Sequence, residues 1–339
     1  MSYELLGITV LWTFLYGYLI VASIDFGAGF FSYYSVVTGQ QNKIHKIIQR
    51  YLSPVWEVTN VFLIFFVVGI VGFFPHTAYY YGTALLIPGS VAVVLLALRG
   101  SYYAFSTYGS KENRGYMLLY GATGLLIPAS LSTVLTISEG GFIEERGGEV
   151  LFLWPKLLAS PYSWSVVLLA IVSVLYISAM FLTYYAAKAR DGNALEVVRG
   201  YALLWSGPTI LSSFLVFLGI RTQNPRHFEN MLDLYWMFAA SFLCFLIAVY
   251  FIWKRKNYGW AFVLVMLQFA FAFYGYGAAH LPYVLYPYIN IYGGFTNETM
   301  ALTLVIAFIA GLFVLIPSMW LLLRLFLFDA GYVQGQKKG

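Results

Sequence analysis

The chain has 339 residues, of which 61% are hydrophobic and only 10% are charged, and its formal net charge is +5. A soluble globular domain has about 25% charged residues, so this composition excludes that class and indicates a protein that crosses a membrane several times. The basic residues are spread among short polar segments, which argues against a surface for nucleic acid. The single cysteine, Cys244, cannot form a disulfide within the chain.

Apolar runs recur along the whole chain, and each is long enough to cross roughly 30 Å of hydrocarbon as a helix. We therefore predict an all-α polytopic membrane protein, one integral membrane domain over residues 1–339. Its nine transmembrane helices are expected to form two four-helix bundles plus one extra helix. The predicted spans are residues 6–36, 54–75, 80–99, 115–137, 163–187, 200–220, 235–253, 260–281 and 300–327.

The basic residues predict the orientation of these spans. With nine spans, all but four of the 19 Lys and Arg residues fall on one side of the membrane. The four on the other side are Arg146, Lys156, Arg221 and Arg226. Cytoplasmic loops are enriched in Lys and Arg, so we expect the N-terminus outside and the C-terminus in the cytoplasm.

Two of the fourteen acidic residues, Asp25 and Glu57, lie inside predicted spans. An ionisable side chain at the centre of a bilayer costs roughly 2.5–3.5 kcal/mol, and it usually faces the bundle interior and marks an ion or proton path. Both acids lie toward the cytoplasmic ends of consecutive, antiparallel spans, which favours a shared proton path from that side. Gly27 and Gly29 would let a second helix approach closely beside Asp25.

Structural explanations remain open for both acids. Glu57 follows Ser53 and Pro54, which are typical of the cap and first residue of a helix, where the helix dipole favours a negative charge. Asp25 has no such position, but it could be a structural acid paired with Arg99 or with a backbone donor.

The sequence shows no self-contained cofactor or metal site. No two histidines lie at mid-membrane depth as the axial ligands of a buried haem would, and no His, Cys and acidic residues have the spacing of a metal motif. Core packing is the favoured explanation for Met180, Met237 and Met266, and a haem-ligand role for His280 is disfavoured. We predict that this chain alone binds no cofactor and no metal.

Two classes of function fit these observations. One is a subunit of a redox complex whose cofactors lie in a partner chain, and the other is an ion-coupled secondary transporter. Transporters often have broken spans with polar linings near the bilayer midplane. Apart from Asp25, the middle of the spans holds few polar groups other than Ser and Thr, which favours the redox complex.

Five short segments, taken in chain order, carry a resemblance to a known family. They are 23-SIDFGAG-29, 54-PVWEVTNVFLI-64, 98-LRGSYYAF-105, 184-YYAAKARDGNALE-196 and 280-HLPYVLYP-287. In their order and in the number of spans, the whole chain resembles subunit II of cytochrome bd-type quinol oxidases. It departs from that family at Ser23, where Gly is common, in lacking the first acid of a D-G-F-D segment, and in a compact external loop between late spans.

The resemblance implies a place in aerobic respiration in the bacterial plasma membrane. Such oxidases reduce O2 to water with electrons from quinol and take protons from the cytoplasm. Haem b, haem d and the quinol site would belong to subunit I, with which this chain would form a heterodimer. The resemblance also implies contact with membrane lipid, and a small single-span third subunit often accompanies the pair.

The resemblance also implies roles for particular residues, none of them catalytic. Asp25 and Glu57 match the family's acids in the first two spans, so they are expected to conduct protons. Trp56 and Arg99 are expected only as structural neighbours of that path, like the two glycines beside Asp25.

Overall fold

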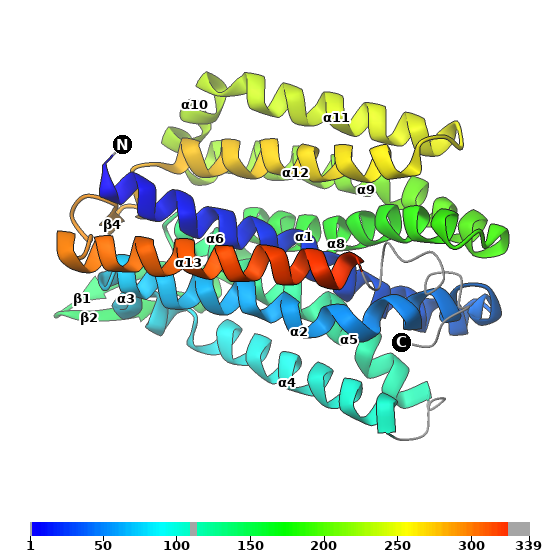
Figure 1. The fold of residues 1–339 in the computed structure, drawn as a ribbon. Helices are drawn as coiled ribbons and strands as arrows, with labels where there is room; N and C mark the ends of the chain where they lie inside the picture. The colour runs from blue at the N-terminus through cyan, green and yellow to red at the C-terminus, as the bar shows by residue number, and fades with distance from the viewer. Residues whose placement is uncertain (1, 109–113, 325–339) are drawn as a thin grey trace.

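The computed structural model describes residues 2–108 and 114–324, apart from the side chains of residues 42, 45, 46, 49–58, 103–108, 114, 322 and 323. In this part, the chain forms thirteen helices and four short strands. The long helices run roughly along one direction and form an elongated bundle (Figure 1). The strands and the N-terminus lie at the same end of the bundle, which we call the strand end.

Within the described residues, each predicted span overlaps a helix or two consecutive helices, and residues 325–327 of the last predicted span lie outside the described part of the chain. The long helices are α1 (Tyr3–Val37), α2 (Gln41–Phe73), α4 (Leu86–Tyr108), α5 (Arg114–Leu131), α8 (Pro161–Lys188), α9 (Gly192–Gln223), α11 (Tyr235–Trp253), α12 (Tyr258–His280) and α13 (Glu298–Leu323). The short elements are α3 (His76–Ala84), α6 (Thr133–Ser138), β1 (Ile143–Arg146), β2 (Glu149–Phe152), α7 (Trp154–Ala159), α10 (Pro225–Asp233), β3 (Tyr283–Leu285) and β4 (Ile289–Asn290).

Seven helical segments in the described residues are long and apolar enough to cross a membrane, and eight if the bent pair α3–α4 is one span. The described apolar part of α2, Thr59–Phe73, is shorter than a full span. The prediction of an all-α polytopic membrane protein is therefore confirmed, whereas the number nine stays a prediction.

The predicted span over residues 80–99 is not one straight helix. It consists of α3 and α4, which meet at an angle of 78°. Pro88 has no N–H to donate to the carbonyl of Ala84, and a proline ring clashes with the carbonyl four residues before it. Helix α3 accordingly ends at Ala84, and α4 begins two residues later with Pro88 in its first turn.

The predicted helix start at Ser53 and Pro54 is wrong. Helix α2 runs without a break from Gln41 to Phe73, so both residues lie inside it. A polar extension of a membrane helix carries no hydropathy signal, which is why the sequence did not reveal the earlier start. Glu57 therefore lies far from the N-terminus of its helix, and the helix dipole no longer explains its charge.

Helices α1 and α8 form the centre of the bundle. Helix α1 packs against α2, α5 and α8, and α8 packs in addition against α9 and α12. Helix α13 lies against α1 and α2 at the periphery (Figure 1), where Phe313 and Val314 are 76% and 70% exposed. The central part of α8 is apolar and buried on all sides, whereas α13 presents apolar side chains outward, as a lipid-facing or partner-facing helix does.

Two small antiparallel hairpins close the strand end. In the first, β1 pairs with β2 so that Ile143 faces Phe152 and Arg146 faces Glu149. Its turn residues Gly147 and Gly148 both have positive φ, which tight hairpin turns require and which glycine adopts without strain. The second hairpin joins β3 to β4, directly after α12.

Candidate functional site

Asp25 and Arg99 form a buried ion pair in the bundle interior. Asp25 lies on α1 and is 1% exposed, and Arg99 lies on α4 and is fully buried. Arg99 Nε donates to Asp25 Oδ2 at 3.0 Å, and Nη2 donates to the backbone carbonyl of Asp25 at 2.8 Å. The guanidinium is planar and holds these two bonds at once, so it fixes both the side chain and the backbone of Asp25.

Helix α5 completes this site with Tyr120. The Tyr120 hydroxyl donates to Asp25 Oδ1 at 3.1 Å, and its backbone carbonyl accepts from Arg99 Nη1 at 2.9 Å. The Arg99 guanidinium carbon lies 3.9 Å from the centroid of the Tyr120 ring and 5.1 Å from that of Phe26. Both carboxylate oxygens of Asp25 therefore have a donor, and the buried cation lies over aromatic faces, as buried charges require.

The two predicted glycines lie at close helix contacts around this pair. A Cβ on Gly29 would lie 3.0 Å from both terminal nitrogens of Arg99, so the arginine occupies the space that the glycine leaves. A Cβ on Gly27 would lie 2.7 Å from the carbonyl oxygen of Val174 on α8. Ser178, also on α8, donates to the carbonyl of Ile24 at 3.0 Å. Gly27 therefore sets the contact between the two central helices.

The structure does not place the other predicted side chains. Trp56 and Glu57 lie within α2, and their side chains fall outside the described part of the chain. The structure therefore brings together Asp25, Arg99 and the two glycines, and it leaves the relation of Glu57 to this group as a prediction.

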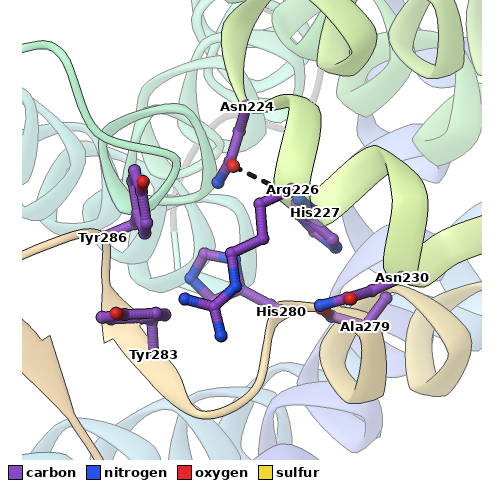
Figure 2. Close-up of a pocket in the computed structure, with 8 residues that line it drawn as sticks. All are labelled: Asn224, Arg226, His227, Asn230, Ala279, His280, Tyr283 and Tyr286. Carbon is purple, nitrogen blue, oxygen red and sulfur yellow. Dashed lines mark hydrogen bonds between the residues drawn. The ribbon is translucent and has the colours of Figure 1, made fainter.

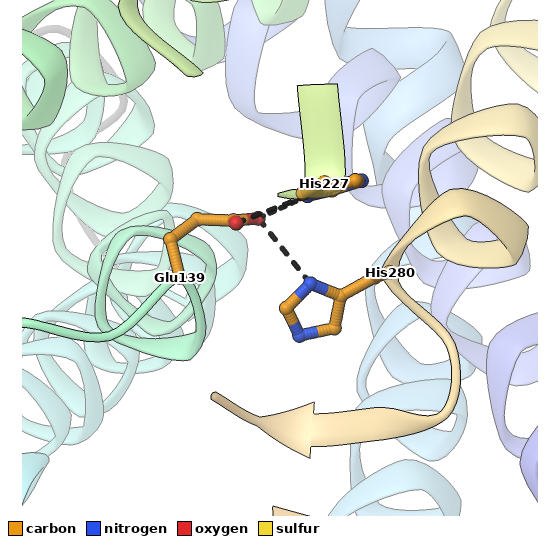
Figure 3. Close-up of side chains that lie close together, drawn as sticks. All are labelled: Glu139, His227 and His280. Atoms are coloured by element: carbon orange, nitrogen blue, oxygen red, sulfur yellow. Dashed lines mark hydrogen bonds and ion pairs between the residues drawn. The ribbon is translucent and has the colours of Figure 1, made fainter. Parts of the chain in front are cut away.

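A second buried polar cluster lies at the strand end, between elements far apart in the sequence. Glu139 follows α6, His227 lies on α10, and His280 ends α12. His227 Nδ1 lies 2.9 Å and 3.0 Å from the two carboxylate oxygens of Glu139, and His280 Nδ1 lies 3.5 Å from Oε1 (Figure 3). The Glu139 and His227 side chains are at most 1% exposed, and that of His280 is 10% exposed.

Neighbouring groups hold the Glu139 carboxylate in place. The Tyr276 hydroxyl donates to Oε1, and Asn224 Nδ2 donates to Oε2 at 2.9 Å. Burial by itself raises the pKa of the Glu139 carboxyl. This effect is outweighed by the hydrogen bond from His227, by the electrostatic effects of His280 and His227, and by the Tyr276 hydroxyl. The pKa of Glu139 therefore lies below its ordinary value. Glu139 is therefore a carboxylate despite its burial.

A small pocket adjoins the two histidines (Figure 2). Its lining residues are Asn224, Arg226, His227, Asn230, Ala279, His280, Tyr283 and Tyr286. Its cavity volume of about 10 Å³ is the room of a single water molecule. The pocket is far too small for a quinol, and two residues of the cluster, His227 and His280, line it.

The sequence alone did not reveal this cluster. Its three residues lie in separate loops or helix ends, so no short motif joins them. Glu139 looked like one of several acids of an external loop, although it is the one that directly follows the fourth predicted span. That position, together with two histidines near the same membrane face, was the signal that could have pointed to a cluster.

Three comparisons with known proteins agree with one another. A family model described as cytochrome bd terminal oxidase subunit II matches residues 3–326. The chain is 33% identical over 341 residues to a Bacillus subtilis (strain 168) protein assigned as subunit II of a cytochrome bd menaquinol oxidase, with 98% of each covered. A chain in the structure of bd oxidase from Geobacillus thermodenitrificans is 63% identical, with a TM-score of 0.85, covering 97% of this chain and 100% of that one.

Proposed function

Because the chain belongs to the cytochrome bd terminal oxidase subunit II family, we propose that it is the haem-free subunit of a bd-type quinol oxidase that reduces O2 to water. In this proposal a partner, subunit I, binds quinol and carries haem b and haem d. The name of the Bacillus relative supports menaquinol as the electron donor. A small single-span third subunit and membrane lipid would complete the complex. Neither the family nor the relatives support the alternative of an ion-coupled transporter.

The proposed topology has nine spans in a single integral membrane domain. The strand end would face outside, and the opposite end, which carries most of the basic residues, would face the cytoplasm. The contacts of α1 with α2 and α5, and of α8 with α9 and α12, support a division into two four-helix groups joined through α1 and α8. Helix α13 would be the extra helix.

We propose further that Asp25 and Glu57 contribute to a proton-uptake path from the cytoplasm. The observation that supports this role is that Asp25 is an almost fully buried carboxylate within a predicted span. It lies on α1, which packs against α2, the helix that contains Glu57. Protons pass between groups within hydrogen-bond reach or bridged by one water. The Tyr120 hydroxyl on Asp25 can both donate and accept a hydrogen bond, so it can extend a chain of such groups.

Arg99 would keep this part of the path neutral. Its positive charge offsets the charge of Asp25, so the pair adds no net charge to the bundle interior. The Tyr18 hydroxyl, two turns before Asp25 on α1, is buried and has no hydrogen-bond partner among the described residues.

Oxygen uptake by the purified complex tests the proton path. We expect Asp25→Asn and Glu57→Gln each to slow oxygen uptake with excess quinol by about tenfold or more, because a missing proton-transfer group costs at least that much. Glu149→Gln, which removes an exposed acid from β2, is the matched control and should leave the rate unchanged. Fully assembled Asp25 and Glu57 variants that turn over at the parent rate would show that this path is dispensable.

The visible absorption spectrum tests the assignment of the cofactors. We expect haem b and haem d bands in the co-purified complex and none in this chain after it is separated from its partner. A separated, folded chain that retains haem would contradict the haem-free role, and an intact chain that never co-purifies with a haem protein would contradict the oxidase assignment as a whole.

A further inference from the structure

We propose that Glu139, His227 and His280 form a binding site for one divalent transition-metal cation, for which zinc is the best match. One atom from each side chain, a carboxylate oxygen or an imidazole nitrogen, lies within 4.8 Å of the other two. One carboxylate and two imidazoles are a common ligand set for zinc, in sites where water takes a fourth position.

The distances between these atoms fit such a site. Ligands about 2.0–2.2 Å from a tetrahedral zinc ion lie roughly 3.3–3.5 Å apart. In the structure, Glu139 Oε1 lies 2.9 Å from His227 Nδ1 and 3.5 Å from His280 Nδ1. Figure 3 shows both rings turned toward the same carboxylate. Small side-chain adjustments would therefore admit the ion.

The hydrogen bonds of His227 require a proton or a cation between its Nδ1 and the Glu139 carboxylate. Its Nε2 lies 3.1 Å from the carbonyl oxygen of Tyr276, which can only accept, so Nε2 carries a hydrogen. In a neutral ring, Nδ1 is then an acceptor that faces another acceptor, Glu139. Either a second proton on His227 or a bound cation must lie between them. Metal-bound histidines commonly donate their other N–H to a backbone carbonyl in this way.

His280 provides a second, independent observation. Its side chain is nine-tenths buried, and neither ring nitrogen has a hydrogen bond of ordinary geometry among the described residues. The Val284 backbone lies within weak hydrogen-bonding reach of the ring, but their contact falls outside ordinary hydrogen-bond geometry. Buried polar atoms are nearly always paired, and a metal ion on Nδ1 would supply the missing partner.

The surroundings also suit a bound ion. Tyr276 and Asn224 donate to Glu139, as the neighbours of metal-binding carboxylates do. The adjoining pocket has room for one water, which would be the fourth ligand. Arg226 lines the same pocket and would repel a metal ion, but its guanidinium carbon lies 4.9 Å from the centroid of the Tyr283 ring, on which its charge is stacked.

Zinc binding to the whole complex tests this site. The complex is stripped with a chelator, dialysed, titrated with zinc chloride and analysed for bound zinc by mass spectrometry. We expect the parent complex to bind one more zinc ion than the His280→Gln complex. The affinity of this site for zinc should be at least about 100-fold lower in His280→Gln than in the parent. His76→Gln, which changes an exposed histidine on α3 at the same end of the bundle, is the matched control and should bind as the parent does.

Anomalous X-ray scattering at the zinc edge provides a second measurement, on the unmodified complex. A peak between Glu139, His227 and His280 is expected after a zinc soak, and this result does not depend on the folding of a variant. Equal zinc binding by the parent and by folded His280→Gln, or no peak at this position, would overturn the proposal. Both experiments apply equally to the chain purified without its partner, so they stand apart from the oxidase assignment.

Discussion

Two buried polar clusters in this molecule offset the negative charge of a carboxylate in different ways. In the interior, Asp25 faces Arg99, which carries a fixed positive charge and whose nitrogens all have partners in the surrounding helices. At the strand end, Glu139 faces two histidines, and one of them has no ordinary hydrogen bond in the described residues. Arginine keeps its proton in proteins, whereas histidine can release or accept one near neutral pH.

This difference separates a permanent charge pair from an adjustable one. The interior cluster lies far from solvent, where an unbalanced charge is costly, so a permanently charged partner stabilises the Asp25 carboxylate. The strand-end cluster adjoins a small pocket, where a proton, a water molecule or a metal ion can enter. We therefore expect substitutions in the interior to disturb stability more than equivalent substitutions at the strand end.

The largest effect is expected from Arg99→Leu. This substitution leaves Asp25 charged, buried and without its partner, which costs about 3–5 kcal/mol of unfolding free energy in buried ion pairs. The yield of assembled protein and its thermal unfolding in detergent measure the loss. We expect little assembled protein at the growth temperature.

A double variant separates lost charge balance from lost packing. Combining Arg99→Leu with Asp25→Asn removes both charges, and replacing a buried pair by neutral groups is often nearly neutral for stability. We expect the double variant to recover more than half of the lost yield. A double variant as poorly assembled as Arg99→Leu alone would mean that the arginine acts through packing.

Gly27→Ala tests the helix contact that supports the interior cluster. Its Cβ would overlap Ser178 and lie 2.7 Å from the backbone oxygen of Val174, so α1 and α8 would have to separate. Overpacking of this kind costs about 1–3 kcal/mol. Gly200→Ala on α9 is the control, because a Cβ there meets nothing within 4 Å and should raise stability by about 0.5–1 kcal/mol. Opposite shifts in the unfolding temperature are expected, and equal shifts would argue against a tight α1–α8 contact.

Glu139→Gln tests the adjustable cluster. The amide keeps the shape of the side chain and removes its charge, so the hydrogen bonds with His227, Asn224 and Tyr276 weaken. We expect a loss of about 1–2 kcal/mol, smaller than for Arg99→Leu because this substitution leaves no permanently charged group buried without its partner. Thermal unfolding in metal-free buffer measures it. A loss as large as that of Arg99→Leu would show that the strand-end charge is fixed as well.

The sequence predicted the interior cluster better than the strand-end cluster for a physical reason. A lone carboxylate inside a span is costly and therefore conspicuous, and Arg99 lies near the end of another span, so the pair could be anticipated. Glu139, His227 and His280 lie at helix ends, where charged residues are common. Only the folded chain brings together the residue that follows α6, the start of α10 and the end of α12.

The sequence predicted the positions of the long helices well, but not all of their ends and bends. Hydropathy located each helix that crosses the bundle, because the bilayer imposes a minimum apolar length. Mean hydropathy registers neither the bend between α3 and α4 nor the early start of α2, although Pro88 in the sequence does predict a bend in the third span. Tyr120 was also missed, because a tyrosine in an aromatic-rich chain gives no signal of its own.

The smallest effect is expected at a third ion pair, between Arg146 and Glu144 on the β1 strand. Its nitrogen–oxygen distance of 2.9 Å almost equals the 3.0 Å between Arg99 and Asp25, but the two side chains are 70% and 41% exposed. Exposed pairs contribute about 0.2–1 kcal/mol and are screened by salt. In low salt, Arg146→Gln should therefore lower the unfolding temperature only slightly, and in about 1 M salt it should not lower it at all. Arg99→Leu should lower the unfolding temperature by the same amount in low and in high salt. A large, salt-independent loss for Arg146→Gln would mean that the distance between the charges, and not their burial, determines how strongly each pair holds the structure together.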